Sequence, residues 1–173
     1  MKVTLIAAMG RQRVIGATGG MPWHLPSEMR HFVRTTRGHP IIVGRKTFGS
    51  WGAKALPRRK NIVVTTRSDY AAPEGVHVAS SLTSALDLAE GAEEVFICGG
   101  AVVYSAFMAR ADQMILTHIE ASFEGDTWFP AWDPSEWSVT RSETYEVDAD
   151  NAYAYTIRWY VRNITPNPST ELA

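Results

Sequence analysis

The sequence contains one cysteine, Cys98, among its 173 residues. A single thiol cannot form an intrachain disulfide, and its scarcity fits a reducing compartment. The formal net charge is only −1, with the basic residues spread along the chain, which argues against a nucleic-acid-binding surface. No apolar run is long enough to span a membrane. The sequence therefore predicts a soluble, cytoplasmic protein that binds neither nucleic acid nor membrane.

Metal-binding and targeting patterns are also missing. The five histidines show no ligand spacing with acids or with the thiol, so we expect no metal site. The N-terminal run MKVTLIAAMGR has a lysine and a short apolar stretch. It meets Gly10 and Arg11 without a cleavage region, which favours a first core strand over a signal sequence.

Apolar, β-branched runs alternate with helical stretches along most of the chain. The expected strands cover 2–8, 40–43, 61–66, 76–79, 94–98, 114–120, 137–147 and 153–162. This alternation predicts an α/β fold with a mostly parallel central sheet of about eight strands and helices on both faces. The turn DADNA (148–152) joins the last two strands, so the sheet should end in a C-terminal antiparallel hairpin.

The expected helices start at recognisable signals. One begins at Pro26, one follows a possible N-cap at Ser81 and stops at Gly91, and one follows Gly100 over 101–111. We expect a single domain over residues 1–162. The tail at 163–173 is polar and interrupted by proline, and we expect it to be disordered.

The run GGMPWHLPSEMRHF (19–32) places a lone acid, Glu28, in the first turn of the first helix. The apolar face of that helix is predicted to contain Met29, Phe32, Val33 and Thr36, and the opposite face Ser27, Arg30, His31 and Arg34. Glu28 lies at the edge of the apolar face. An acid in a first turn is commonly explained by the helix dipole, and a functional acid in a pocket is the alternative.

Two strand–glycine–helix junctions could bind phosphate. IIVGRKTF (41–48) places Gly44 before a basic helix start. FICGGAVVY (96–104) places Gly99 and Gly100 before a second, uncharged helix start. Helix N-termini offer free N–H groups and partial positive charge. The first junction is not a P-loop, and the second lacks the spacing of the dinucleotide fingerprint. The alternative for the first is a solvated basic surface, and the alternative for the second is an ordinary tight turn.

Taken in order, the motifs resemble those of the dihydrofolate reductases. They are LIAAM, GGMPWHLPSEMRHF, PIIVGRKTF, LPRRKNIVVTTR, ICGGAVVY and LTHIEASFEGDTWFP, followed by an aromatic strand. The resemblance runs from residue 2 to 162. It implies an oxidoreductase that transfers hydride from NADPH to C6 of 7,8-dihydrofolate and adds a proton at N5. The tetrahydrofolate formed would supply one-carbon metabolism, and antifolate inhibitors would bind the same pocket.

The resemblance also implies which residues form the site. The catalytic residues would be Met21, Trp23, Glu28 and Thr117. The substrate would contact Ile6, Glu28, Phe32, Trp51, Arg59 and Thr117. NADPH would contact Ala8, Ile15, Gly16, Gly20, Gly44, Arg45, Lys46, Thr47, Thr65, Thr66, Arg67, Gly99, Gly100, Ala101, Val102 and Tyr104.

Within that set the resemblance implies specific roles. Glu28 would hydrogen-bond the 2-amino group and a ring nitrogen of the pterin, and Trp23 would help to hold a water. Arg59, with Arg58 as the next candidate, would bind the α-carboxylate of the glutamate tail. Gly99 and Gly100 would be joined by a cis peptide. The enzyme is expected to be a monomer.

The loop at 9–24 is expected to be a lid that closes on Asp126, because Ala152 in the hairpin tip offers no side-chain hydrogen bond. Two departures from the family stand out: Cys98 replaces an aliphatic pocket residue, and Val102 replaces an arginine found in some members. Two alternative functions are a related pyrimidine reductase of riboflavin synthesis and a non-catalytic nucleotide-binding module.

Overall fold

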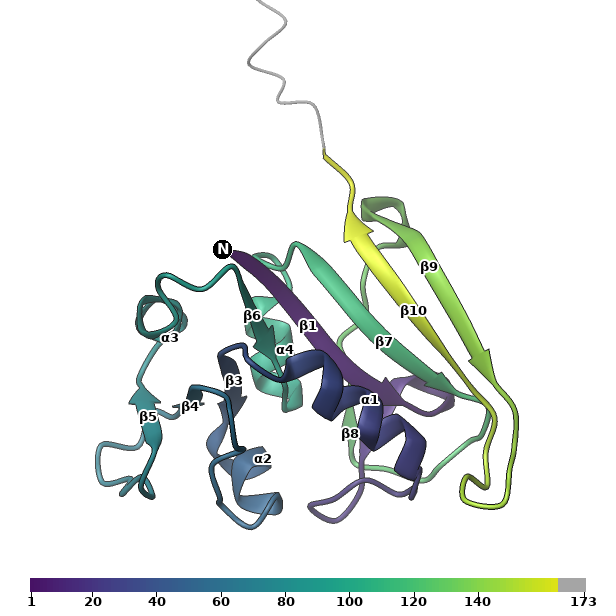
Figure 1. Cartoon of the computed structure of the whole chain (residues 1–173), viewed down its shortest axis with the longest axis horizontal. Coiled ribbons are helices and arrows are strands. Elements are labelled where there is room, and N and C mark those ends of the chain that lie inside the picture. The colour runs from purple at the N-terminus through teal and green to yellow at the C-terminus, as the bar shows by residue number, and fades with distance from the viewer. Residues whose placement is uncertain (165–173) are drawn as a thin grey trace, which may run out of the picture.

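Ten strands form the framework of residues 1–164, the part of the chain that this computed structural model describes. They are β1 (Lys2–Met9), β2 (Val14–Gly16), β3 (Ile41–Gly44), β4 (Asn61–Val64), β5 (Val76–Ala79), β6 (Glu94–Ile97), β7 (Gln113–Ile119), β8 (Thr127–Trp128), β9 (Trp137–Tyr145) and β10 (Tyr155–Arg162). Eight of them make one sheet in the order β5-β4-β3-β6-β1-β7-β10-β9 (Figure 1).

The first six strands in that order pair in parallel, and β10 pairs antiparallel with both β7 and β9. The parallel pairs are each separated along the chain by longer connections, several of them helical, whereas β9 and β10 are joined by a hairpin. The predicted α/β fold with its C-terminal antiparallel hairpin is confirmed.

Four α-helices cover the two faces of the sheet. They are α1 (Pro26–Thr36), α2 (Arg45–Ser50), α3 (Leu82–Leu88) and α4 (Ala101–Phe107). Because side chains alternate along a strand, β1 supplies both cores. Leu5 packs with residues of α3 and α4, and Ile6 packs with residues of α1 and α2. Figure 1 shows α1 lying across the front of the sheet.

Several elements are shorter than predicted, for local reasons. The strand predicted to reach residue 66 ends at Val64, because the Thr65 hydroxyl accepts the N–H of Arg67 at 3.1 Å and turns the chain. The helix predicted over 101–111 ends at Phe107. Arg162 closes this helix end, donating to the carbonyl of Ala111 at 2.8 Å and to that of Met108 at 2.5 Å.

A second, two-stranded sheet was not predicted. It pairs β2 with β8 antiparallel, so that Val14 lies opposite Trp128 and Gly16 opposite Thr127. The strands have three and two residues, which is too short for a hydrophobic period to appear in the sequence. This pairing anchors the middle of the lid, residues 9–24, to β8.

The predicted orientation of α1 is wrong at two positions. His31 was expected on the polar face, yet it is buried and meets the Trp159 ring edge-on, with 6.0 Å between ring centroids. Met29 was expected in the core, yet it is 43% exposed. The aromatic surface of β10 selects which side of α1 packs inward, and periodicity within the helix cannot reveal that surface.

Residues 163 and 164, which were expected to belong to a disordered tail, are part of the described chain. Asn163 was assigned to a disordered tail, but its backbone N–H donates to the carbonyl of Glu136 at 2.8 Å. Its side-chain amide also donates to Ser135 O at 2.8 Å. The remainder of the predicted tail, residues 165–173, lies outside the described residues.

The N-cap of α3 provides a test of local stability. Ser81 Oγ accepts the N–H of Ser84 at 3.0 Å, and Ser84 Oγ in turn accepts the N–H of Ser81 at 3.1 Å. Ser81→Ala should lower the free energy of unfolding by roughly 1 kcal/mol, the usual contribution of such a cap. Urea denaturation measures the change. Ser80→Ala, next to the cap, is the control and should leave the midpoint unchanged; equal midpoints for both variants would contradict the assignment.

Candidate active site

The centre of the site is a buried acid beside a buried hydroxyl. Glu28, the third residue of α1, is 7% exposed, and Thr117 of β7 is 1% exposed. Thr117 Oγ1 donates to Glu28 Oε1 at 3.1 Å. Thr117 also lies beside Ala8 in the parallel pairing of β1 and β7. The structure thus joins two predicted catalytic residues that are 89 positions apart in sequence.

Burial sets the protonation of this acid. Loss of water around the carboxyl group raises the pKa of Glu28 from 4.5 to about 7, and the hydrogen bond from Thr117 opposes part of that rise. No other protein group within residues 1–164 donates a hydrogen bond to the carboxyl group. Its second oxygen is therefore free to bind a ligand that carries N–H groups, and the acid can hold or release a proton near neutral pH.

Apolar side chains around Glu28 form the expected wall of a ring-binding pocket. Ile6, Trp23, Phe32 and Trp51 all belong to the core cluster on the α1 face of the sheet. Phe32 and Trp51 meet edge to face with centroids 6.2 Å apart. Trp23 packs on Phe123, which was not predicted as a site residue, with centroids 5.2 Å apart. These contacts bring most of the predicted substrate residues together.

The indole nitrogen of Trp23 is notable because it is buried and has no hydrogen-bond partner within the described residues. Buried N–H groups in proteins are nearly always paired. An unpaired indole N–H in this cluster therefore suits a water or a ligand atom at that point.

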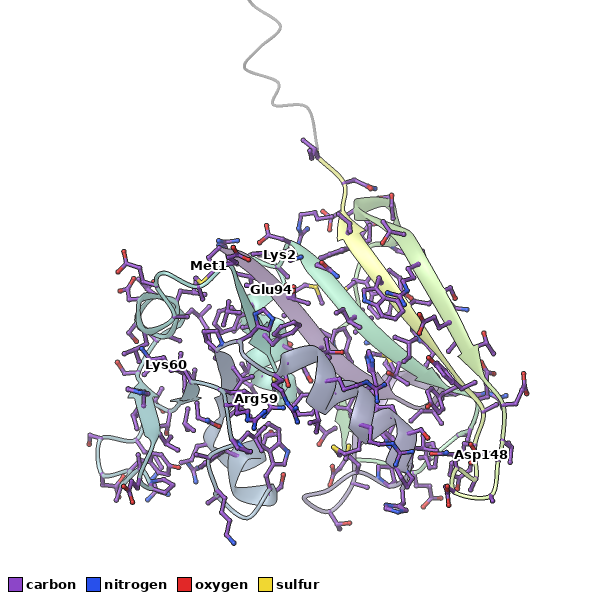
Figure 2. All side chains as sticks on the ribbon, in the orientation of Figure 1. Met1, Lys2, Arg59, Lys60, Glu94 and Asp148 are labelled. Atoms are coloured by element: carbon purple, nitrogen blue, oxygen red, sulfur yellow. The ribbon has the colours of Figure 1, made fainter. Side chains whose placement is uncertain are left out.

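Arg59 is held rigidly at the far end of α1. Its Nε donates to Thr36 Oγ1 at 2.9 Å and its Nη2 to the carbonyl of Val33 at 2.8 Å. Nη1 donates to the carbonyl of Pro57 at 2.6 Å. Figure 2 shows the Arg59 side chain beside α1. A guanidinium has five N–H donors, so the two remaining ones can bind a carboxylate, whereas Arg58 is exposed.

The two glycine junctions lie next to each other at the ends of neighbouring strands. Gly44 N donates to the carbonyl of Gly99 at 2.7 Å, and the Gly99–Gly100 peptide is cis, as the resemblance implied. A Cβ atom on Gly100 would lie 2.7 Å from Thr47 Oγ1, so any larger residue there would force the Thr47 side chain to move. Gly44 and Gly100 are the N-caps of α2 and α4, and neither helix has a side-chain cap. The first N–H groups of both helices are therefore open to an anion.

Three other predicted cofactor residues differ in their burial and in their contacts. Tyr104 is buried and its hydroxyl donates to the carbonyl of Ile6 at 2.6 Å, which ties α4 to β1 beneath the site. Val102 in the first turn of α4 is 82% exposed. Arg67 already forms a two-pronged ion pair with Asp69, at 3.1 and 3.0 Å. That acid was not predicted, and it must share Arg67 with any phosphate that binds there.

The lid meets the partner predicted for it. The Thr18 N–H donates to Asp126 Oδ2 at 3.1 Å, and Asp126 N donates to the carbonyl of Gly16 at 3.0 Å. Met21, proposed from sequence as catalytic, is 48% exposed. Its side chain lines a hollow of about 690 Å³ between the end of the lid and the hairpin tip, together with Trp23 and Asp148.

Every helix within residues 1–164 is too short or too polar to cross a membrane. The same residues contain no cluster of three or more histidine, cysteine or acidic side chains that could hold a metal ion. Cys98 is buried, and burial raises the pKa of its thiol.

Known proteins resemble this chain along almost its full length. The family model described as Dihydrofolate reductase matches residues 2–162. A dihydrofolate reductase of Bacillus subtilis (strain 168) is 44% identical over 158 residues, which are 91% of this chain and 93% of that protein. Dihydrofolate reductase HdrB of Haloferax volcanii is 44% identical over 149 residues, covering 81% of this chain and 76% of that protein.

A solved structure shows the same similarity in three dimensions. It is dihydrofolate reductase from Enterococcus faecalis complexed with NADP(H) and RAB-propyl. The TM-score is 0.88 at 36% sequence identity, covering 94% of this chain and 97% of that chain. The likeness therefore extends over both the sheet and the helices around the site.

The raised pKa of Glu28 predicts a pH dependence of stability. Between pH 4.5 and about 7 the folded state keeps a proton on Glu28 that the unfolded state has released, so the free energy of unfolding falls as pH rises through this window. At about 1.4 kcal/mol per pKa unit, the loss is of the order of 3 kcal/mol. Urea denaturation at several pH values measures it. Glu28→Gln is the control, because its side chain does not titrate; parallel stability curves for the two proteins would contradict the prediction.

Proposed function

The chain belongs to the dihydrofolate reductase family, and on that premise we propose that it reduces 7,8-dihydrofolate to tetrahydrofolate with NADPH, using Glu28 as its pterin-binding acid. The observation that carries the assignment of Glu28 is its burial beside Thr117, with one carboxyl oxygen free for a ligand. The pyrimidine reductase and the non-catalytic module have no comparable use for a buried acid at this position.

The residues at the glycine junctions fit NADPH. The uncapped first turns of α2 and α4 lie side by side and can bind its phosphates, with Arg45, Lys46 and Thr47 at the first junction. Thr65, Thr66 and Arg67, at the end of β4, can contact the phosphate on the adenosine ribose. NADPH supplies the hydride when it is bound. The lid, including Ile15, Gly16 and Gly20, then excludes bulk water from the reacting rings.

The substrate is held from three sides. Two N–H groups of the pterin face the carboxyl group of Glu28, and each hydrogen bond is strengthened by charge when that group is ionised. Ile6, Phe32 and Trp51 pack on the rings. The indole of Trp23 holds a water near the pterin, and Arg59 binds the α-carboxylate of the tail. The protein thus aligns the substrate and controls water access, and these effects lower the barrier to hydride transfer.

The wider assignments follow from the same family membership. The chain binds a small-molecule substrate and antifolate inhibitors, as its family does. We further propose that it acts as a cytoplasmic monomer whose single domain covers residues 1–162, and that it binds no nucleic acid. The near-neutral net charge of −1 supports the last point.

The direct test of this function is NADPH oxidation, followed by absorbance, with and without 7,8-dihydrofolate. The expected result is rapid oxidation only when dihydrofolate is present, with tetrahydrofolate as the product. Absence of a dihydrofolate-dependent rate in the folded protein would overturn the proposal.

Removal of the acid should slow turnover. Glu28→Ala should lower kcat/KM for dihydrofolate by roughly 10²- to 10⁴-fold at neutral pH, the usual range for a lost proton-handling group. At low pH the substrate arrives already protonated, so much of the loss should be recovered. Steady-state kinetics across pH measures both effects, and NADPH affinity is the control. A near-normal rate at neutral pH would exclude Glu28 as the catalytic acid.

Removal of the Arg59 side chain should weaken binding of the substrate through its glutamate tail and should not weaken binding of NADPH. Hydrogen bonds to charged groups contribute roughly 1.5 to 3 kcal/mol each, so Arg59→Ala should raise the Kd for dihydrofolate by at least about tenfold and leave the Kd for NADPH unchanged. The matched control is Arg58→Ala, since the Arg58 side chain is exposed. A pterin substrate without the glutamate tail should bind the Arg59→Ala variant and the parent equally. Equal weakening for that substrate would show that Arg59 supports the fold instead.

A further inference from the structure

The start of α1, just before Glu28, lacks a cap of its own. The N-cap residue, Leu25, is apolar and makes no side-chain hydrogen bond, and Pro26 at the first helical position has no N–H. The next free donor is the N–H of Ser27. Helix starts usually satisfy such donors with a nearby serine, threonine, aspartate or asparagine. This helix must therefore obtain its partner from elsewhere in the chain.

Asn151, in the tip of the β9–β10 hairpin, supplies that partner. Its Oδ1 accepts the N–H of Ser27 at 3.1 Å, and its Nδ2 donates to Ser27 Oγ at 2.9 Å. The two residues are 124 positions apart, and Asn151 is only 2% exposed. A buried amide that contacts both the backbone and the side chain of one residue fixes the position of that residue.

The hairpin tip holds Asn151 in place for this contact. Asp148 Oδ1 accepts the backbone N–H of Asn151 and its side-chain Nδ2, each at 2.8 Å, and the N–H of Asp150 at 2.9 Å. The Asp148 N–H donates to the carbonyl of Asn151 at 3.1 Å, which closes the turn. Figure 2 shows Asp148 in the tip, near the first turn of α1. The cap is thus preorganised before it meets the helix.

We propose that Asn151 is a positioning residue of the reductase, which fixes the first turn of α1 and thereby the carboxyl group of Glu28. The inference rests on the proposed function, because it assumes that the placement of Glu28 limits catalysis. Ser27 directly precedes Glu28, and Leu25 is 4% exposed in the core beside Trp23. The Asn151 amide and the buried Leu25 side chain hold the start of the helix from two sides. Loss of the amide would leave the first turn of α1 held by Leu25 on one side only.

The test compares Asn151→Ala with a matched control in the full chain. Asn151→Ala should lower kcat for dihydrofolate at neutral pH about tenfold, because small misplacements of a reacting group cost one to two orders of magnitude. NADPH affinity should not change. Asn163→Ala also removes side-chain hydrogen bonds to distant residues, Ser135 and Ser138, but Asn163 follows β10 (Tyr155–Arg162) whereas Asn151 precedes it, so the two lie at opposite ends of that strand. It should keep the parental kcat.

A second cycle separates positioning from general damage. In a Glu28→Gln background, Asn151→Ala should lower kcat less than twofold, since residues that act through one group are not additive. Should Asn151→Ala fold poorly, Asp148→Ala keeps both contacts to Ser27 and only loosens the tip; it should lower kcat in the same direction by a smaller factor. A parental kcat in either folded tip variant, or an equal loss in both Glu28 backgrounds, would overturn the proposal.

A measurement without turnover keeps this inference separate from the proposed function. The titration of the Glu28 carboxyl group can be followed by carbon NMR in the parent and in Asn151→Ala. A loosened helix start admits water, so the pKa of Glu28 should fall from about 7 toward its ordinary value. An unchanged titration would overturn the positioning role. If the pKa of Glu28 falls in Asn151→Ala but the parent shows no dihydrofolate-dependent oxidation, the reductase assignment is overturned and the positioning role is not.

Discussion

The structure is organised around the burial of one carboxyl group. Removing a carboxylate from water costs several kcal/mol even after the protein relaxes, whereas one hydrogen bond from a neutral hydroxyl contributes about 1 kcal/mol. Thr117 alone therefore cannot hold Glu28 fully ionised, and the raised pKa follows. The fold accepts this local loss of stability. The carboxyl group is thereby kept among apolar side chains, where few water molecules compete with the N–H groups of a ligand for its oxygen atoms.

The parallel sheet explains how the remaining site residues reach that acid. Ligands of open α/β sheets bind beyond the carboxyl ends of the strands, and Ala8, Gly44 and Gly99 lie at or just after the ends of β1, β3 and β6. The central position of β1 brings residues from distant parts of the chain to one edge. The hydrogen bond from Tyr104 to the carbonyl of Ile6 ties α4, where the cofactor is proposed to bind, to β1, where the substrate is proposed to bind.

The sequence was sufficient for the fold class, because strands and helices depend on short-range patterns. The site residues that it named are still predictions, although the structure does bring Glu28 and Thr117 together. Strand–helix alternation predicted the sheet, and Ser81 predicted the cap of α3. What it could not reveal depends on contacts between distant segments. The inward turn of His31 needs the Trp159 ring, the pairing of β2 with β8 needs both loops, and Asn151 looks like an ordinary turn residue until its contact with Ser27 is seen. Periodicity alone predicted no ligand roles, and the roles proposed above were predicted from the order of the motifs.

The central place of β1 also affects how the chain folds while it is being made. The neighbours of β1 in the sheet are β6 and β7, which begin at Glu94 and Gln113. At about 5 to 20 residues per second, the ribosome needs roughly 4 to 17 s to move from the end of β1 to the start of β6. During that interval the apolar strand has no edge to pair with. A nascent chain of this topology therefore carries β1 without its sheet partners for several seconds, and an unpaired apolar strand is prone to aggregation during that time.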